Sequence, residues 1–265
     1  AVASADSTLS STGAIELESG SAVAGASGLV SVQVGSSQTR SGDLILSIGA
    51  STATAGTIAL TAGQSSAQTG GSVSLISGAS SQNVGGSIEI KSGSSSSSST
   101  GNINIQSGQA SEGLTGSVSV QTGMSGLNGG NIEIATGDSQ DAAGVISLSA
   151  GASSAGVGGS LALNSGGSGL LSSGAVSIST AASPDNSGSL LLNTGDSHGA
   201  DSGSIVLMTG SATEASGSVS LAVGQSSTGI GGSVTVKAGN SQSSTGGSVN
   251  IASGESRDSY SGQVL

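Results

Sequence analysis

Few residues of this chain have side chains suited to chemistry, and the first is His198, the single histidine. It lies between Asp196 and Asp201, and an imidazole flanked by carboxylates could bind a metal or exchange protons. Either role needs further partners, and the neighbouring residues are only serine, glycine and alanine. We therefore interpret His198 as a solvated turn residue.

Acidic residues offer two further hypotheses. Asp138, Asp196 and Glu255 occupy equivalent places in a repeat and could begin a calcium ladder, but they lie four repeats apart, with neutral residues between them. The other carboxylates are scattered, and one of them is close in sequence to a lysine, as at Glu89 and Lys91. We interpret all of these as solvated surface residues. They are Asp138, Asp196, Glu255, Glu16, Glu18, Glu89 and Glu133.

Serine and glycine are abundant, but neither points to a catalytic or nucleotide-binding motif. A serine nucleophile needs a base within reach, and only the repeat with His198 contains one. The pairs Gly70–Gly71 and Gly158–Gly159 lack the lysine and the strand-to-helix transition of a phosphate-binding loop. The sequence thus predicts no catalytic, cofactor-binding or metal site, and no enzyme.

Composition narrows the partners. The 265 residues include 15 acidic and 4 basic side chains, a net charge of -11, which disfavours nucleic acid and anionic membrane surfaces. No apolar run approaches the ~20 residues of a membrane-spanning helix. Only Tyr260 is aromatic and there is no cysteine, so an ordinary globular core or a disulfide framework is not expected.

A repeat organises the whole sequence. Eighteen glycines, here called opening glycines, follow one another at intervals of 15 residues eleven times and 14 residues six times. Such a short, constant period is typical of a solenoid. The opening glycines are Gly13, Gly28, Gly42, Gly56, Gly71, Gly86, Gly101, Gly116, Gly130, Gly144, Gly159, Gly174, Gly188, Gly203, Gly217, Gly232, Gly247 and Gly262.

Each repeat predicts a strand followed by a turn. The second and fourth residues after the opening glycine, here positions two and four, are always aliphatic, as in Val73 and Leu75. This alternation predicts a strand with one buried face. Position seven is a closing glycine, such as Gly78, for which we expect a positive φ. The next residue but one, such as Ser80, is serine or alanine and is expected to point inward.

These features predict an all-β fold: a flattened two-sided β-solenoid, of the β-helix or β-roll kind, with about 17 coils of 14–15 residues and a thin aliphatic core. Residues 1–265 are expected to form one continuous array. A local irregularity is expected where Ala181 replaces a closing glycine beside Pro184, the single proline. Because neither end has a cap, we expect either a window from a longer repeat protein or ends that neighbouring subunits cover.

The repeat G-x-[VIL]-x-[VIL]-x-x-G-x-[SA] resembles the Gly/Ser-rich β-solenoid arrays of extracellular surface and filament proteins, of the microalgal, protist or bacterial-adhesin type. That resemblance implies a structural role at the cell surface or outside the cell, as a shaft, filament or surface-layer subunit. The expected partners are copies of the chain or other structural subunits, end to end or side by side. The many serines leave room for O-linked glycans.

Ice binding is the alternative function. The coil length is similar to that of the grass antifreeze β-rolls, and a flat solenoid can present ordered ranks of threonine. Here only Thr57 and Thr61 share a strand on the outward face, and the other outward positions are mixed. The sequence therefore favours a structural role.

Overall fold

The computed structural model describes residues 2–9, 11–257 and 259–264, and none of these residues forms a helix or a strand. The expected β-solenoid is therefore wrong, and the terms β-solenoid and β-helix do not apply to this chain. It is an extended, non-globular chain in which almost every described residue is exposed.

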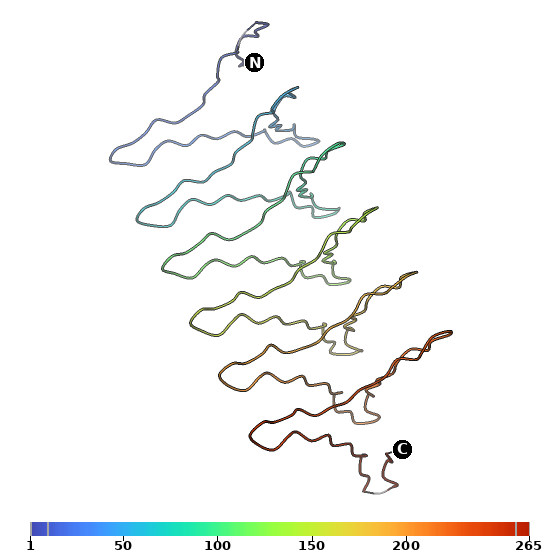
Figure 1. Ribbon diagram of the computed structural model, residues 1–265. Helices are drawn as coiled ribbons and strands as arrows, with labels where there is room; N and C mark the ends of the chain where they lie inside the picture. The colour runs from blue at the N-terminus through green and yellow to red at the C-terminus, as the bar shows by residue number, and fades with distance from the viewer. Residues whose placement is uncertain (1, 10, 258, 265) are drawn as a thin grey trace. The chain divides into compact units, whose positions relative to one another are not determined.

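The chain divides into two units, Ala1–Glu133 and Ile134–Leu265. Within each unit the same local pattern recurs, as Figure 1 shows: an extended stretch of backbone alternates with a tight loop. We call residues from an opening glycine to the residue before the closing glycine an extended segment, as in 71–77. The residues from the closing glycine to the next opening glycine form a return loop, as in 78–86.

The backbone hydrogen bonds of the described residues are local and build no sheet. Among the described residues they join only the two ends of a return loop: the opening-glycine N–H donates to the carbonyl of the closing glycine eight residues earlier. A solenoid would instead pair residues one repeat apart across a strand spacing of ~4.8 Å. The donors of these bonds are Gly71, Gly86, Gly101, Gly159, Gly174, Gly247 and Gly262, at 2.8–3.4 Å.

No described residue is buried, so the predicted aliphatic core is absent. Position-two side chains are 46–67% exposed and position-four side chains 61–78%. Each repeat contributes only two regular aliphatic side chains against the conformational entropy of ordering 14 or 15 residues, many of them glycine and serine. No aromatic side chain adds buried area among the described residues.

The closing glycines have a different conformation from the one expected. No glycine among the described residues has a positive φ, and a Cβ built on Gly78 would meet no atom within 4 Å. The opening glycines are the constrained ones: a Cβ on Gly71 would lie 3.1 Å from the Gly63 nitrogen and 3.2 Å from the Ala62 Cβ. The two ends of a return loop approach closely at the opening glycine, so a side chain has little room there. At the closing glycine a side chain has open space.

Candidate functional site

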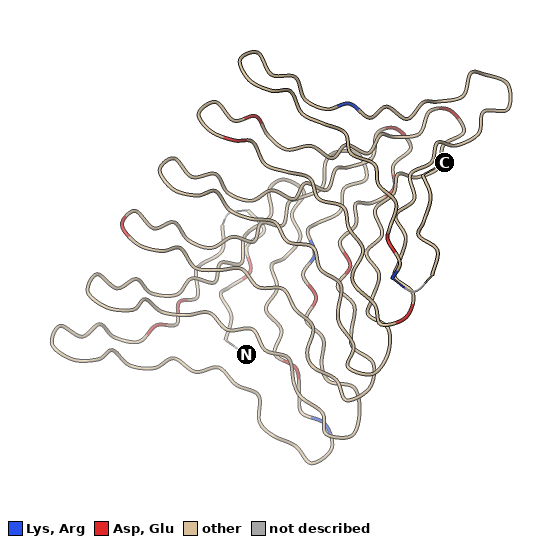
Figure 2. Ribbon diagram, turned by 90° about the horizontal axis from the view of Figure 1, so that it is seen from below, with Lys and Arg blue, Asp and Glu red and all other residues tan. Residues whose placement is uncertain are grey.

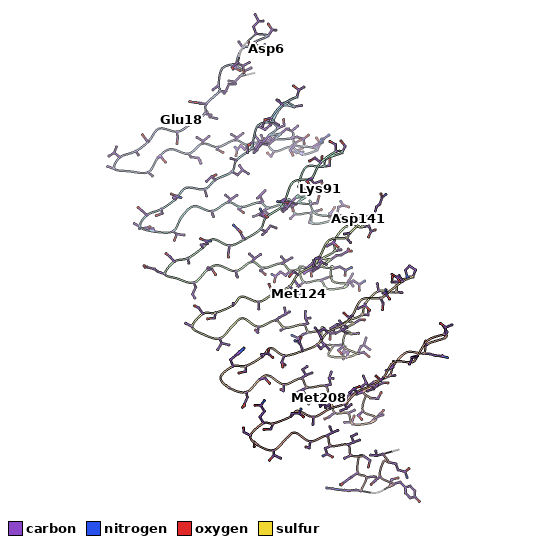
Figure 3. All side chains as sticks on the ribbon, in the orientation of Figure 1. Asp6, Glu18, Lys91, Met124, Asp141 and Met208 are labelled. Atoms are coloured by element: carbon purple, nitrogen blue, oxygen red, sulfur yellow. The ribbon has the colours of Figure 1, made fainter. Side chains whose placement is uncertain are left out.

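The residues considered for chemistry do not come together. His198, Asp196 and Asp201 are exposed on the return loop that begins at Gly195. Figure 3 shows side chains projecting from the ribbon along its whole path. The described residues contain no group of three or more potential metal ligands and no pocket.

Two ion pairs are present in the described part of the chain. Arg40 Nη2 lies 3.6 Å from Asp43 Oδ2, and both side chains are mostly exposed. Lys91 pairs with Glu89 on the same extended segment, as their spacing in sequence indicated. Exposed pairs of this kind contribute little to stability. Both pairs are local surface contacts, and neither forms part of a reactive cluster.

The most regular surface feature is the aliphatic ranks, which we define as the position-two and position-four side chains of all repeats. In the extended segment 71–77, Val73 and Leu75 alternate with serines, so an extended backbone places both on one face. Ile76 lies on the opposite face and is 88% exposed, against 56% for Val73 and 70% for Leu75. In each described repeat the ranks therefore leave an apolar face exposed.

A second recurrent feature lies in the return loops. Fourteen of the seventeen loops carry serine two residues after the closing position, and in every one its Oγ accepts a hydrogen bond from a backbone N–H two or three residues later. Such bonds stabilise turns locally. We call these residues cap serines: Ser37, Ser51, Ser65, Ser80, Ser95, Ser125, Ser139, Ser153, Ser168, Ser183, Ser197, Ser226, Ser241 and Ser256.

The cap serines correct the sequence prediction. A small residue was expected here because it would point into a thin core, but these residues are exposed and their hydroxyl groups cap the loop. Ala22, Ala110 and Ala212 occupy the same place and have no hydroxyl group to accept this bond. Small size is therefore shared by all seventeen residues, and the capping hydroxyl group by fourteen of them.

Loop length determines which amide the cap serine binds. In the long loops, which belong to the 15-residue repeats, the amide three residues onward donates to the cap serine at 2.9–3.2 Å, as Asn83 N–H does to Ser80. In three of these loops the amide two residues onward also donates, at 3.3–3.4 Å. The short loops of the 14-residue repeats bond the second residue at 3.1–3.3 Å, as Ala53 N–H donates to Ser51. All seven backbone bonds that close a loop belong to long loops. The two lengths therefore have two different structures.

The irregularity expected at Pro184 does not alter this rule. Ser183 accepts a hydrogen bond from Asp185 N–H at 3.3 Å, as in the other short loops. Replacement of the closing glycine by Ala181 is tolerated because a Cβ at closing positions meets open space, as at Gly166 and Gly195. The loop is a regular member of its class.

Each return loop narrows to a neck where position six, the last residue of the extended segment, meets the next opening glycine. At every opening glycine the atoms within 4 Å of a built Cβ include the preceding position-six side chain. The least exposed of the described residues all occupy this position or, for Ser4, the equivalent place before Gly13. They are Ser4, Ser19, Ala62, Ser77, Thr194 and Ala238.

Charge is sparse along the chain. Figure 2 shows isolated acidic and basic residues separated by long neutral stretches. The described residues contain no helix with the length and apolarity needed to cross a membrane. No family model, curated protein or solved structure matches the chain. The ranks and the loops are therefore the features of this chain that point to a function.

Sequence reasoning identified the aliphatic ranks but missed the cap serines and the necks. A signal for the caps was present, since serine occupies fourteen of seventeen equivalent places. The alternation of 14- and 15-residue repeats was a second signal, because the difference falls entirely in the return loop. The change in hydrogen-bond pattern that the extra residue brings is visible only in the folded loop.

Proposed function

We propose that this chain is a structural protein of the cell surface or extracellular space, which builds shafts, filaments or layers by lateral association of its extended segments. The observation that carries the proposal is the periodic exposure of the aliphatic ranks over the whole repeat array. Exposed apolar patches beyond a few hundred Å² mark interaction surfaces. Extended backbone with free N–H and C=O groups can also pair with another chain.

The surroundings of the ranks support a passive role. The remaining positions of the extended segments are mostly small and polar, and the charged residues are few, so neighbouring chains can approach closely. Partners in this proposal are copies of the chain or other structural subunits, and the serine-rich loops remain open to O-linked glycans. Location outside the cell is supported by the resemblance of the repeat.

Ice binding is not proposed. It needs a flat, rigid face that presents ordered groups, and the described residues build no sheet. Thr57 and Thr61 lie on one exposed extended segment without a rank of threonines beside them.

The test is concentration-dependent assembly, followed by sedimentation velocity and negative-stain electron microscopy. Leu75→Ser removes a rank side chain, whereas Ile76→Ser makes the same change on the opposite face of the same segment. Burial of such a side chain contributes about 1.5–3 kcal/mol, so Leu75→Ser is expected to raise the assembly concentration about tenfold or more. Ile76→Ser should have a much smaller effect. A wild-type chain that stays monomeric at all concentrations would refute the proposal.

A further inference from the structure

The chain exposes far more surface than a compact protein of its size. Its accessible area is 26298 Å² for a mass of 24.3 kDa. A compact monomer of that mass exposes roughly 10,000 Å², which leaves an excess of roughly 16,000 Å². A stable protein interface buries about 1,200–2,000 Å² in total. The excess is enough for several interfaces along each chain.

The spacing of the ranks restricts what can cover them. An extended partner must present its own apolar pairs on seven-residue segments, separated by loops of matching length, over seventeen repeats. A partner with a different period would lose the match within a few repeats, because a slip of one residue turns its side chains to the other face. A second copy of this chain has the required spacing at every repeat.

The order of long and short loops restricts the arrangement further. Two parallel, unshifted copies pair every return loop with one of its own length, at all seventeen places. A shift of one repeat leaves eight of the sixteen overlapping loops matched, and an antiparallel pair matches seven of seventeen. Loops of equal length also have the same local structure. Long and short loops differ in the amide that binds the cap serine, and the backbone bonds that close a neck are found only in long loops.

Charge opposes this arrangement only weakly. In-register copies place each acidic residue beside its own counterpart, but 15 acidic residues are distributed over 265 positions. Where Glu89 meets its copy, Lys91 lies two residues away on the same face and pairs with it. At physiological ionic strength, acidic residues more than ~8 Å apart along the chains are largely screened from one another, so the repulsion is confined to each residue and its own counterpart.

We propose that the aliphatic ranks are covered by a second copy of this chain, which lies parallel and in register, and that the order of long and short return loops sets this register. The inference rests on the proposed structural role and adds the identity of the partner and its alignment.

The absence of cysteine allows site-specific spin labels on the full chain. Ser74→Cys and Ser220→Cys place labels at equivalent positions ten repeats apart, on the face opposite the ranks. In assemblies of either single variant, we expect dipolar broadening between identical sites, which disappears on dilution with unlabelled chain. In an equal mixture of the two variants, each label is diluted twofold by chains labelled at the other site. We therefore expect the mixture to show only the broadening that one variant shows when half of its chains are replaced by unlabelled chain. Weak or absent broadening between identical sites, as antiparallel chains or chains shifted by whole repeats would give, overturns the inference.

A loop-length variant tests the register mechanism. Deleting Ala67, Gln82 and Ser97 turns three successive long loops into short ones, while the control Ala67→Ser, Gln82→Ala and Ser97→Ala keeps their length. The deletion variant should assemble with itself but enter wild-type assemblies about tenfold less than the control does, because misfitting loops displace the adjacent aliphatic pairs. Equal entry overturns the inference alone. If no variant and no wild-type chain assembles, the proposed function fails with it.

Discussion

The neck of the return loop gives a prediction that separates the two classes of glycine. Gly71 opens a repeat, and its N–H donates to the Gly63 carbonyl at 2.9 Å. A Cβ at this position would lie 3.1 Å from the Gly63 nitrogen and 3.4 Å from its oxygen, both backbone atoms that cannot rotate away. Gly71→Ala should therefore open the neck and break this bond. Gly78 closes the same extended segment, and Gly78→Ala adds its Cβ to open space.

The expected magnitude follows from the bond that is lost. A hydrogen bond of this kind contributes about 0.5–1.5 kcal/mol net, which corresponds to about a twofold to tenfold change in the open fraction of the loop. Both variants lose the same backbone freedom of glycine in the unfolded chain, a stabilising effect of about 0.4–1 kcal/mol that cancels in the comparison. Their difference therefore reports the neck contact.

Amide hydrogen exchange, measured by NMR on the full chain, provides the assay. Each variant is followed at its own neck: the residue-71 amide for Gly71→Ala, and for Gly78→Ala the Gly86 amide, which donates to the residue-78 carbonyl at 2.8 Å in the wild-type chain. We expect faster exchange, after correction for intrinsic rates, only at residue 71. An equal loss of protection at Gly86 in Gly78→Ala would refute the assignment of the constraint to opening glycines.

Three further predictions concern the loops and the assembly. Ser80→Ala removes a cap, so the Asn83 amide, which donates to Ser80 Oγ at 2.9 Å, should exchange about twofold to tenfold faster; unchanged exchange would show that the cap is not formed in solution. Ala110→Ser introduces a cap serine into a long loop, so the Gly113 amide, three residues later, should exchange about twofold to tenfold more slowly. Slower exchange at Glu112 instead would contradict the length rule. Raising the salt concentration from low to physiological ionic strength screens the repulsion between chains of net charge -11. The assembly concentration measured by sedimentation should therefore fall. The opposite trend would indicate that attraction between opposite charges drives association.

The sequence by itself determined the period, the alternation and the polarity of each repeat. Val73 and Leu75 share a face because any extended backbone alternates its side chains, whether or not a sheet forms. Placement of the loop between Gly78 and Gly86 was likewise predictable from the cluster of small and polar residues there. Local features of this kind depend on residues close together in the chain.

Only the tertiary structure decided whether successive repeats meet. The same pattern that predicts a buried strand face is found here on segments that remain exposed, because two aliphatic side chains per repeat do not offset the ordering of 14 or 15 residues. The necks and the cap hydrogen bonds are likewise features of the structure that the residue types alone do not reveal. Gly71 and Ala62 are nine residues apart, and nothing in their types indicates that they touch. Long-range pairing depends on the balance between burial and chain entropy over the whole array, which the period of a sequence does not measure.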